Sequence, residues 1–148
     1  LRLTSLDVYL LHNPEYFFSH AVEADGQPAA ARLEALRGQF YARVQGAFEQ
    51  LEREVKRGRI TSYGVSSNSL VRPAADPEAT DLSRMLGAAV AAAERVWGDD
   101  RVHHFRVVQL PANLLEAGAL LEQNHPGPSS ALAFAESKPG SSSLSSAS

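Results

Sequence analysis

Apolar residues occur along the chain in blocks that alternate between strand-like and helix-like patterns. The first block, residues 6–11, reads LDVYLL and stops at His12. A short apolar run without alternation is typical of a strand buried on both faces, as in a parallel sheet. The next residues, 19–36, are mixed, and Gly26 and Pro28 interrupt any regular element there.

The clearest helix signal covers residues 37–57, because apolar side chains recur there at steps of three or four. Gly58 is the expected stop of this helix. Glu52 and Lys56 form a favourable i,i+4 pair, which we expect on its solvated face. The predicted apolar stripe consists of Phe40, Val44, Phe48, Leu51 and Val55.

Two further strands and a helix follow in the same rhythm. Residues 60–67, ITSYGVSS, are rich in β-branched side chains and predict a strand. A helix then runs to about Trp97, with Thr80 or Asp81 as its N-cap. Residues 105–110, FRVVQL, predict a third strand.

The remainder of the chain is less regular. A short helix is expected near residues 131–136, after a loop rich in proline and glycine. The serine-rich residues 139–148 predict a disordered tail, which leaves residues 1–138 as one folded unit.

Strands separated by single amphipathic helices run parallel and have right-handed crossovers. Two α/β architectures fit this order, a doubly wound open sheet and a (β/α)8 TIM barrel. Dinucleotide sites of open sheets use a GxGxxG turn, which this sequence lacks. We therefore expect a partial barrel of about three parallel strands with their helices.

Functional side chains of parallel α/β folds gather where strands end. Here those positions hold His12, then Ser66, Ser67 and Asn68, and finally Gln109. Each residue also has a structural interpretation, as turn, cap or buried hydrogen-bonding group. Together they predict a neutral polar pocket that suits an amide or a carbonyl rather than acid-catalysed hydrolysis.

Composition narrows the classes of function further. The chain has no cysteine, which excludes disulfides and thiolate chemistry, and a net charge of −3, which gives no reason to expect nucleic acid. No metal site is expected, because the adjacent His103 and His104 would point to opposite faces of a strand. We expect no membrane span and no signal peptide, and hence a cytoplasmic protein.

Three segments resemble the aldo-keto reductases. LDVYLLHNP (6–14) resembles the family strand that ends in the catalytic histidine. AFEQLEREVKRGRITSYGVSSNS (47–69) resembles the helix and strand that end in gly-val-ser-asn, and VVQLPANLLE (107–116) resembles the strand whose glutamine faces the nicotinamide. The motifs occur in the family's order and cover residues 5–137.

The resemblance implies an NAD(P)-dependent oxidoreductase that transfers hydride between NADP or NAD and a small carbonyl or alcohol substrate. His12 would orient and polarise the carbonyl. Gln109, with Ser66 and Asn68, would hold the nicotinamide carboxamide. The sequence has an additional serine in this motif, so that either Ser67 or Asn68 takes the place of the family's asparagine.

The family's tyrosine proton donor, with its lysine and aspartate, precedes the histidine strand, and none of the four tyrosines here matches that position. We therefore expect a central fragment whose open strand edges can associate with other chains. The alternatives are a truncated binding or regulatory module of the same fold, or an unrelated α/β enzyme with fortuitous motif matches.

Loss of the acid alone slows such a reaction by roughly 10²–10⁴. We therefore predict that the purified 148-residue chain does not turn over carbonyl substrates. The measurement is consumption of NADPH, followed by its absorbance, with aldehyde and ketone substrates. Turnover that scales with protein concentration would contradict the prediction.

Overall fold

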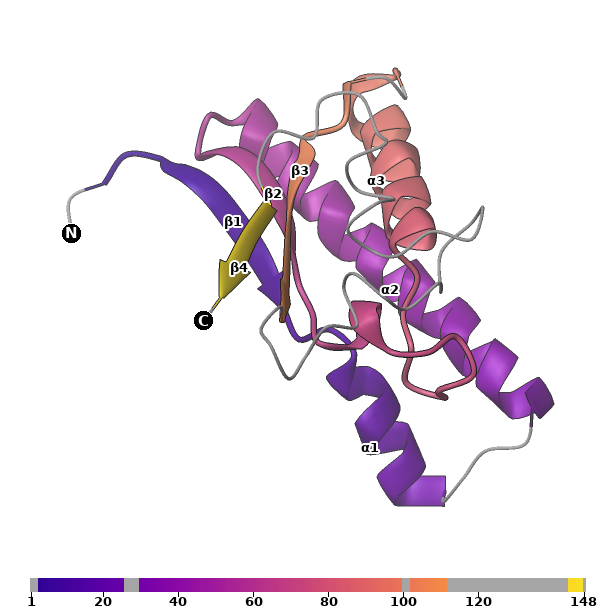
Figure 1. Ribbon diagram of the computed structural model, residues 1–148. Coiled ribbons are helices and arrows are strands. Elements are labelled where there is room, and N and C mark those ends of the chain that lie inside the picture. The colour runs from indigo at the N-terminus through magenta and orange to yellow at the C-terminus, as the bar shows by residue number, and fades with distance from the viewer. Residues whose placement is uncertain (1–2, 26–29, 100–101, 112–143, 148) are drawn as a thin grey trace.

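A computed structural model of the protein describes residues 3–25, 30–99, 102–111 and 144–147. Strands and helices alternate over much of this part of the chain (Figure 1). In chain order the elements are β1 (Leu6–His12), α1 (Tyr16–Asp25), α2 (Ala30–Lys56), β2 (Ile60–Ser66), the 3-10 helix η1 (Ser69–Val71), α3 (Leu82–Trp97), β3 (Phe105–Pro111) and β4 (Leu144–Ala147).

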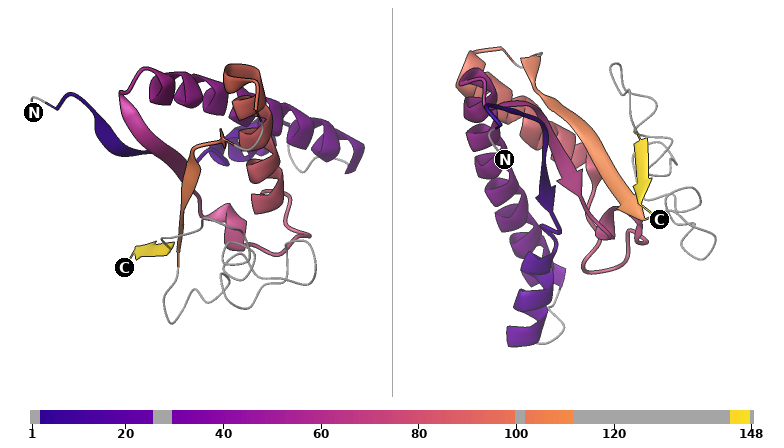
Figure 2. Two further views of the ribbon diagram at one scale, coloured as in Figure 1. Left: turned by 90° about the horizontal axis from the view of Figure 1, so that it is seen from above. Right: turned by 90° about the vertical axis from the view of Figure 1, so that its left-hand side faces the viewer.

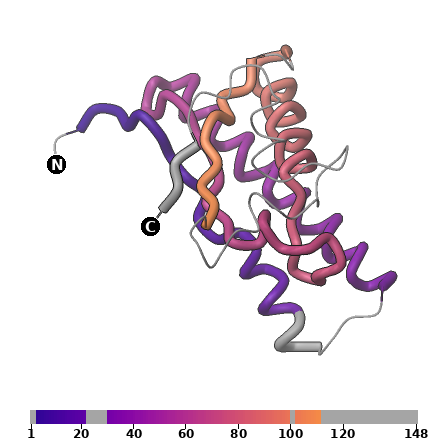
Figure 3. Tube along the Cα trace, viewed as in Figure 1, coloured from indigo at the N-terminus to yellow at the C-terminus, as the bar shows by residue number. Residues whose placement is uncertain are grey.

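The strands form one open sheet in the order β1-β2-β3-β4, and every neighbouring pair is parallel. The α/β class and the parallel strands predicted from the sequence are thus confirmed. Figure 2 shows α2 and α3 packed against the same face of this sheet. In the Cα trace of Figure 3, β2 lies between β1 and β3.

No helix in the described part of the chain is long and apolar enough to cross a membrane.

Helix α2 carries the centre of the core. The predicted stripe faces the sheet, with Phe40, Val44, Phe48 and Leu51 buried and Val55 partly buried beside them. The helix ends where predicted, and Gly58 takes a φ of 72°, a left-handed conformation that favours glycine. Its start is seven residues earlier than expected, at Ala30.

Helix α1 was not predicted from the sequence. Its Phe18 is 1% exposed and packs on Phe40, with ring centroids 4.8 Å apart. Phe17 packs beside them against the core. This tertiary contact with α2 stabilises a segment for which the local sequence pattern predicted no helix.

Helix α3 matches its prediction closely. The carboxylate of Asp81 caps it, because its Oδ1 accepts a hydrogen bond from the backbone N of Ser83 at 2.7 Å. Small side chains bring α3 close to the rest of the core, with Ala89, Ala92 and Ala93 fully buried. The helix ends at Trp97, followed by Gly98.

Strands β2 and β3 approach each other closely at Gly64. A Cβ atom placed on this residue would collide with the backbone of Val107. The register between the two strands also shifts here, between Tyr63 and Gly64. The absence of a side chain at this position therefore permits the pairing that continues to the strand ends.

Leu144–Ala147 pairs in parallel with β3 as strand β4, within the serine-rich residues 139–148 for which composition predicts disorder. Backbone pairing along the edge of β3 needs no particular side chain, so composition alone did not reveal it. The helix expected near residues 131–136 lies outside the described residues.

A buried carboxylate connects α2 to three other parts of the fold. Glu52 is 0% exposed. Its Oε1 accepts hydrogen bonds from the hydroxyl of Tyr63 at 2.9 Å and the backbone N of His104 at 2.7 Å. Its Oε2 accepts one from Trp97 Nε1 at 2.8 Å and lies 2.7 Å from His104 Nδ1. Glu52 thereby joins α2, β2, α3 and the segment that leads into β3.

The expected pairing of Glu52 with Lys56 on a solvated face was wrong. Lys56 instead donates to the carbonyl of Val96 at 2.9 Å and lies over the ring of Trp97.

Burial raises the pKa of the Tyr63 hydroxyl well above its usual range, and the charge of Glu52 adds to this effect. The Tyr63 hydroxyl therefore stays protonated at any physiological pH and donates a hydrogen bond to Glu52.

Replacement of Glu52 by alanine should destabilise the chain by about 3–5 kcal/mol, because it leaves buried donors without an acceptor. Urea denaturation followed by circular dichroism measures the change. The matched control is Glu54→Ala on the same helix, which removes surface ion pairs with Arg57 and Arg59 and should cost at most about 1 kcal/mol. Equal losses in both variants would contradict this role for Glu52.

Candidate functional site

The ends of the first three strands bring three of the predicted site residues into one row. His12 is the register partner of Ser66, and Ser66 is the register partner of Gln109. Neighbouring strands lie about 4.8 Å apart, so the backbones of His12 and Gln109 are separated by roughly 10 Å. The row spans three strands and lies at their carboxyl ends.

All three side chains share one face of the sheet. The preceding row, Leu11, Val65 and Val108, packs into the core beneath the helices. Side chains alternate between faces along a strand, so His12, Ser66 and Gln109 belong to the face opposite α2 and α3. His12 is exposed, Gln109 is half-buried and Ser66 is buried.

In the loop after β2, Ser67 and Asn68 lie in different environments. Ser67 is 1% exposed, and its Oγ lies 3.1 Å from Ser69 Oγ, which in turn lies 2.8 Å from the hydroxyl of Thr80. Asn68 is exposed, and its side chain makes no capping hydrogen bond to η1. The hydroxyl of Ser67 is therefore engaged within the protein, whereas the amide of Asn68 faces solvent.

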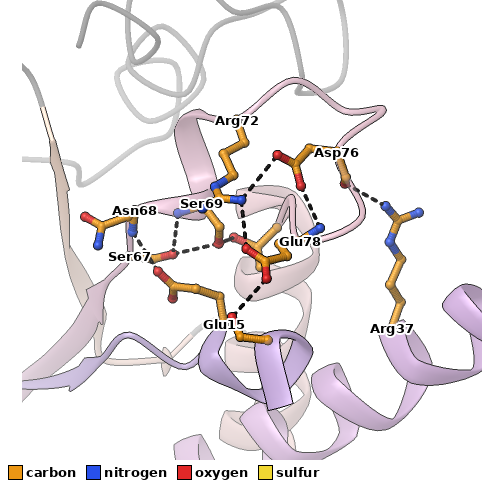
Figure 4. A network of polar contacts seen from close by, with 10 residues as sticks. Glu15, Arg37, Ser67, Asn68, Ser69, Arg72, Asp76 and Glu78 are labelled. Atoms are coloured by element: carbon orange, nitrogen blue, oxygen red, sulfur yellow. Dashed lines mark hydrogen bonds and ion pairs between the residues drawn. The ribbon is translucent and has the colours of Figure 1, made fainter. Parts of the chain in front are cut away.

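Backbone contacts fix the three strand ends relative to one another. The N–H of Asn13 donates to the carbonyl of Ser66 at 2.8 Å, and the N–H of Ser67 donates to the carbonyl of Gln109 at 3.1 Å. The N–H of Asn68 donates to Glu15 Oε1 at 2.8 Å. The loops after β1 and β2 are thus held by a neighbouring strand or loop, and Figure 4 shows the contact between Glu15 and Asn68.

An outer polar network braces the longer loop between η1 and α3 (Figure 4). Arg72 pairs with Glu78 at 2.8 Å and with Asp76 at 3.2 Å. Ser19 of α1 donates to Glu78 at 2.9 Å, and Arg37 of α2 donates to the carbonyl of Asp76 at 3.3 Å. The loop after β2 therefore rests on both preceding helices.

The aromatic residues after His12 lie partly in the core and partly on the surface. Phe17 and Phe18 pack in the core with Phe40. Tyr16 is 57% exposed, and its hydroxyl accepts a hydrogen bond from Asn13 Nδ2 at 3.1 Å.

A shallow apolar pocket of about 230 Å³ lies on the helix side of β1. None of the predicted site residues contributes to it. The lining residues are Leu11, Pro14, Phe17, Phe40, Arg43, Val44 and Ala47.

The histidines at the start of β3 have structural partners. His104 contacts Glu52, whereas His103 Nδ1 lies 3.2 Å from Arg106 Nη1. Burial and the nearby Arg106 lower the pKa of His103. No group of three or more potential ligand side chains in the described part of the chain is placed to hold a metal ion.

The row and its loops form a neutral hydrogen-bonding surface. An imidazole, a hydroxyl and two amides supply both donors and acceptors, and none of them requires a charged ligand. Sequence reasoning named these residues but missed Glu15, whose carboxylate accepts a hydrogen bond from the backbone N–H of Asn68. Asn113, a further amide residue that follows the third strand, lies outside the described residues.

Comparison of the chain with protein-family models, with curated proteins and with solved structures gave no match.

Ser67 and Asn68 should respond differently to truncation. Ser67→Ala breaks the buried hydroxyl chain and should cost about 1–2 kcal/mol of stability. Asn68→Ala removes an exposed side chain and should change stability by less than about 0.5 kcal/mol. Thermal and urea unfolding of both variants give the comparison. A larger loss for Asn68→Ala than for Ser67→Ala would contradict the assignment of Ser67 to the interior.

Proposed function

We propose that the chain is part of an aldo-keto reductase, in which its strand ends orient a carbonyl group and hold the carboxamide of NADP or NAD. The observation that supports this most directly is the row formed by His12, Ser66 and Gln109. Each of the three residues ends a separate strand, and each occupies the motif position that the family resemblance gives it.

A (β/α)8 barrel is the architecture that we propose for the complete fold. The strands of the described residues are neighbours in the sheet in the order of the chain, and α2 and α3 cover the same face of the sheet. A doubly wound sheet reverses its strand order and has helices on both faces. The sequential order therefore supports the barrel, whose interior face would carry the row.

The residues present fit a carboxamide. A carboxamide offers one acceptor oxygen and two N–H donors, and the amides of Asn68 and Gln109 with the hydroxyl of Ser66 can satisfy both kinds of group. The exposure of Asn68 and the burial of Ser67 favour Asn68 for the role of the family's asparagine.

In the proposed reaction His12 hydrogen-bonds the substrate carbonyl oxygen and stabilises the negative charge that develops there. The bound nicotinamide supplies or accepts the hydride. Gln109 and Asn68 fix the ring plane so that one face is presented to the carbonyl held by His12. Tyr63 is unsuitable as the proton donor, since its hydroxyl is committed to Glu52 on the opposite face of the sheet.

The alternative function, a binding module of the same fold, rests on the edge strand β1. Val8 and Tyr9 are 42% and 47% exposed there, although they lie in a strand. An exposed apolar edge strand can pair with a strand of another chain.

The two functions can be compared by titrating the ¹⁵N-labelled chain with nicotinamide mononucleotide. We expect shifts centred on Ser66, Asn68 and Gln109, and weaker shifts with nicotinic acid mononucleotide, which has a carboxylate in place of the carboxamide. Gln109→Ala should weaken binding roughly tenfold, the effect of about 1.4 kcal/mol. The control Gln50→Ala, on the exposed side of α2, should leave it unchanged.

Absence of shifts at the strand ends would overturn the reductase proposal. If the signals of β1 instead broaden as the protein concentration rises, the binding module is favoured. Equal shifts with the two mononucleotides would show that the surface does not recognise the carboxamide.

A further inference from the structure

Glu15 occupies an unusual position between β1 and α1. It is 5% exposed, yet it lies only three residues after the exposed His12. Its Oε1 accepts a hydrogen bond from the backbone N–H of Asn68 at 2.8 Å. A carboxylate from the first strand end thereby holds the loop at the second strand end (Figure 4).

A second hydrogen bond connects the same part of the chain to β2. The N–H of Asn13 donates to the carbonyl of Ser66, so the loop after β1 is bonded both to the last residue of β2 and to Asn68 in the loop that follows it. Asn13 has a φ of 46°, a left-handed conformation that asparagine tolerates better than most residues. The two contacts together fix the backbone that follows His12 relative to the backbone of Asn68.

Stability alone explains Glu15 poorly. Its second oxygen, Oε2, is buried and has no hydrogen-bond partner among the described residues. A buried acceptor without a donor costs free energy, and such groups call for a functional explanation. A carboxylate does, however, make a stronger hydrogen bond to a backbone N–H than a neutral acceptor makes.

We propose that Glu15 is a positioning residue for nicotinamide binding. It acts through the backbone of Asn68, holding the loop so that the Asn68 side chain meets the carboxamide at the correct distance from His12. This inference rests on the function proposed above. Glu15 itself lies behind the loop and does not touch the cofactor.

Hydrogen exchange of the Asn68 amide tests the contact without any ligand. In the unmodified chain this amide should exchange slowly, although its side chain is exposed. Glu15→Ala should accelerate exchange at least tenfold, and Glu15→Gln, which keeps a neutral acceptor, should give an intermediate rate. The control is Glu49→Gln. Glu49 lies in the C-terminal half of α2, its side chain is 13% exposed, and it pairs with Arg95 of α3. This variant should leave the exchange rate of the Asn68 amide unchanged.

The same variants then receive nicotinamide mononucleotide. We expect binding to weaken roughly tenfold in Glu15→Ala and to recover in part in Glu15→Gln, in parallel with the exchange rates. Unchanged exchange at Asn68 in Glu15→Ala would overturn the contact. Faster exchange with unchanged affinity would overturn the positioning role.

The failure of the two proposals is distinguishable. If the unmodified chain binds no nicotinamide mononucleotide, the proposed function is wrong and the positioning role falls with it, whatever the exchange rates. If the unmodified chain binds but the Glu15 variants bind equally well, only the positioning role is wrong. Circular dichroism of Glu15→Gln shows whether a loss of binding reflects unfolding.

Discussion

The fold depends above all on one carboxylate that is fully removed from water. Glu52 faces the sheet from α2 and meets donors from β2, from the end of α3 and from the segment before β3. Burial of a charged group is costly unless hydrogen bonds replace its hydration. All of these donors have to be in place at the same time. This single side chain therefore fixes the positions of β2, α3 and the segment before β3 relative to α2, and the surrounding aromatic packing contributes to the same arrangement.

The elements with a strong hydrophobic periodicity could be predicted from the sequence, whereas contacts between residues far apart in the sequence could not. The stripe around Val44 and Phe48 located α2, and the cap predicted at Thr80 or Asp81 located the start of α3, which the structure assigns to Asp81. Glu52 was misread because its neighbours in sequence are charged, whereas its partners lie 11 to 52 residues away. A signal did exist, since Glu52 lies four residues after Phe48, on the apolar stripe itself.

The candidate site shows the same division. Its row could be predicted because strand ends are visible in a sequence and parallel strands align those ends. Glu15 could not be predicted, because its contact is with a backbone N–H, which every residue except proline offers. Helix α1 was missed for a related reason, since the packing of Phe18 on Phe40 is absent from the local pattern.

The order of the strands also bears on how the protein is made. Among the residues that the structure describes, each strand pairs with the next strand along the chain, so a growing polypeptide can add strands to one edge of the sheet as it leaves the ribosome. Before β3 is synthesised, β1 and β2 can pair with each other, α2 can cover them, and much of the aromatic core is present. Pairing between successive elements keeps contacts comparatively local, which favours rapid assembly and shortens the time for which a strand edge stays exposed during synthesis.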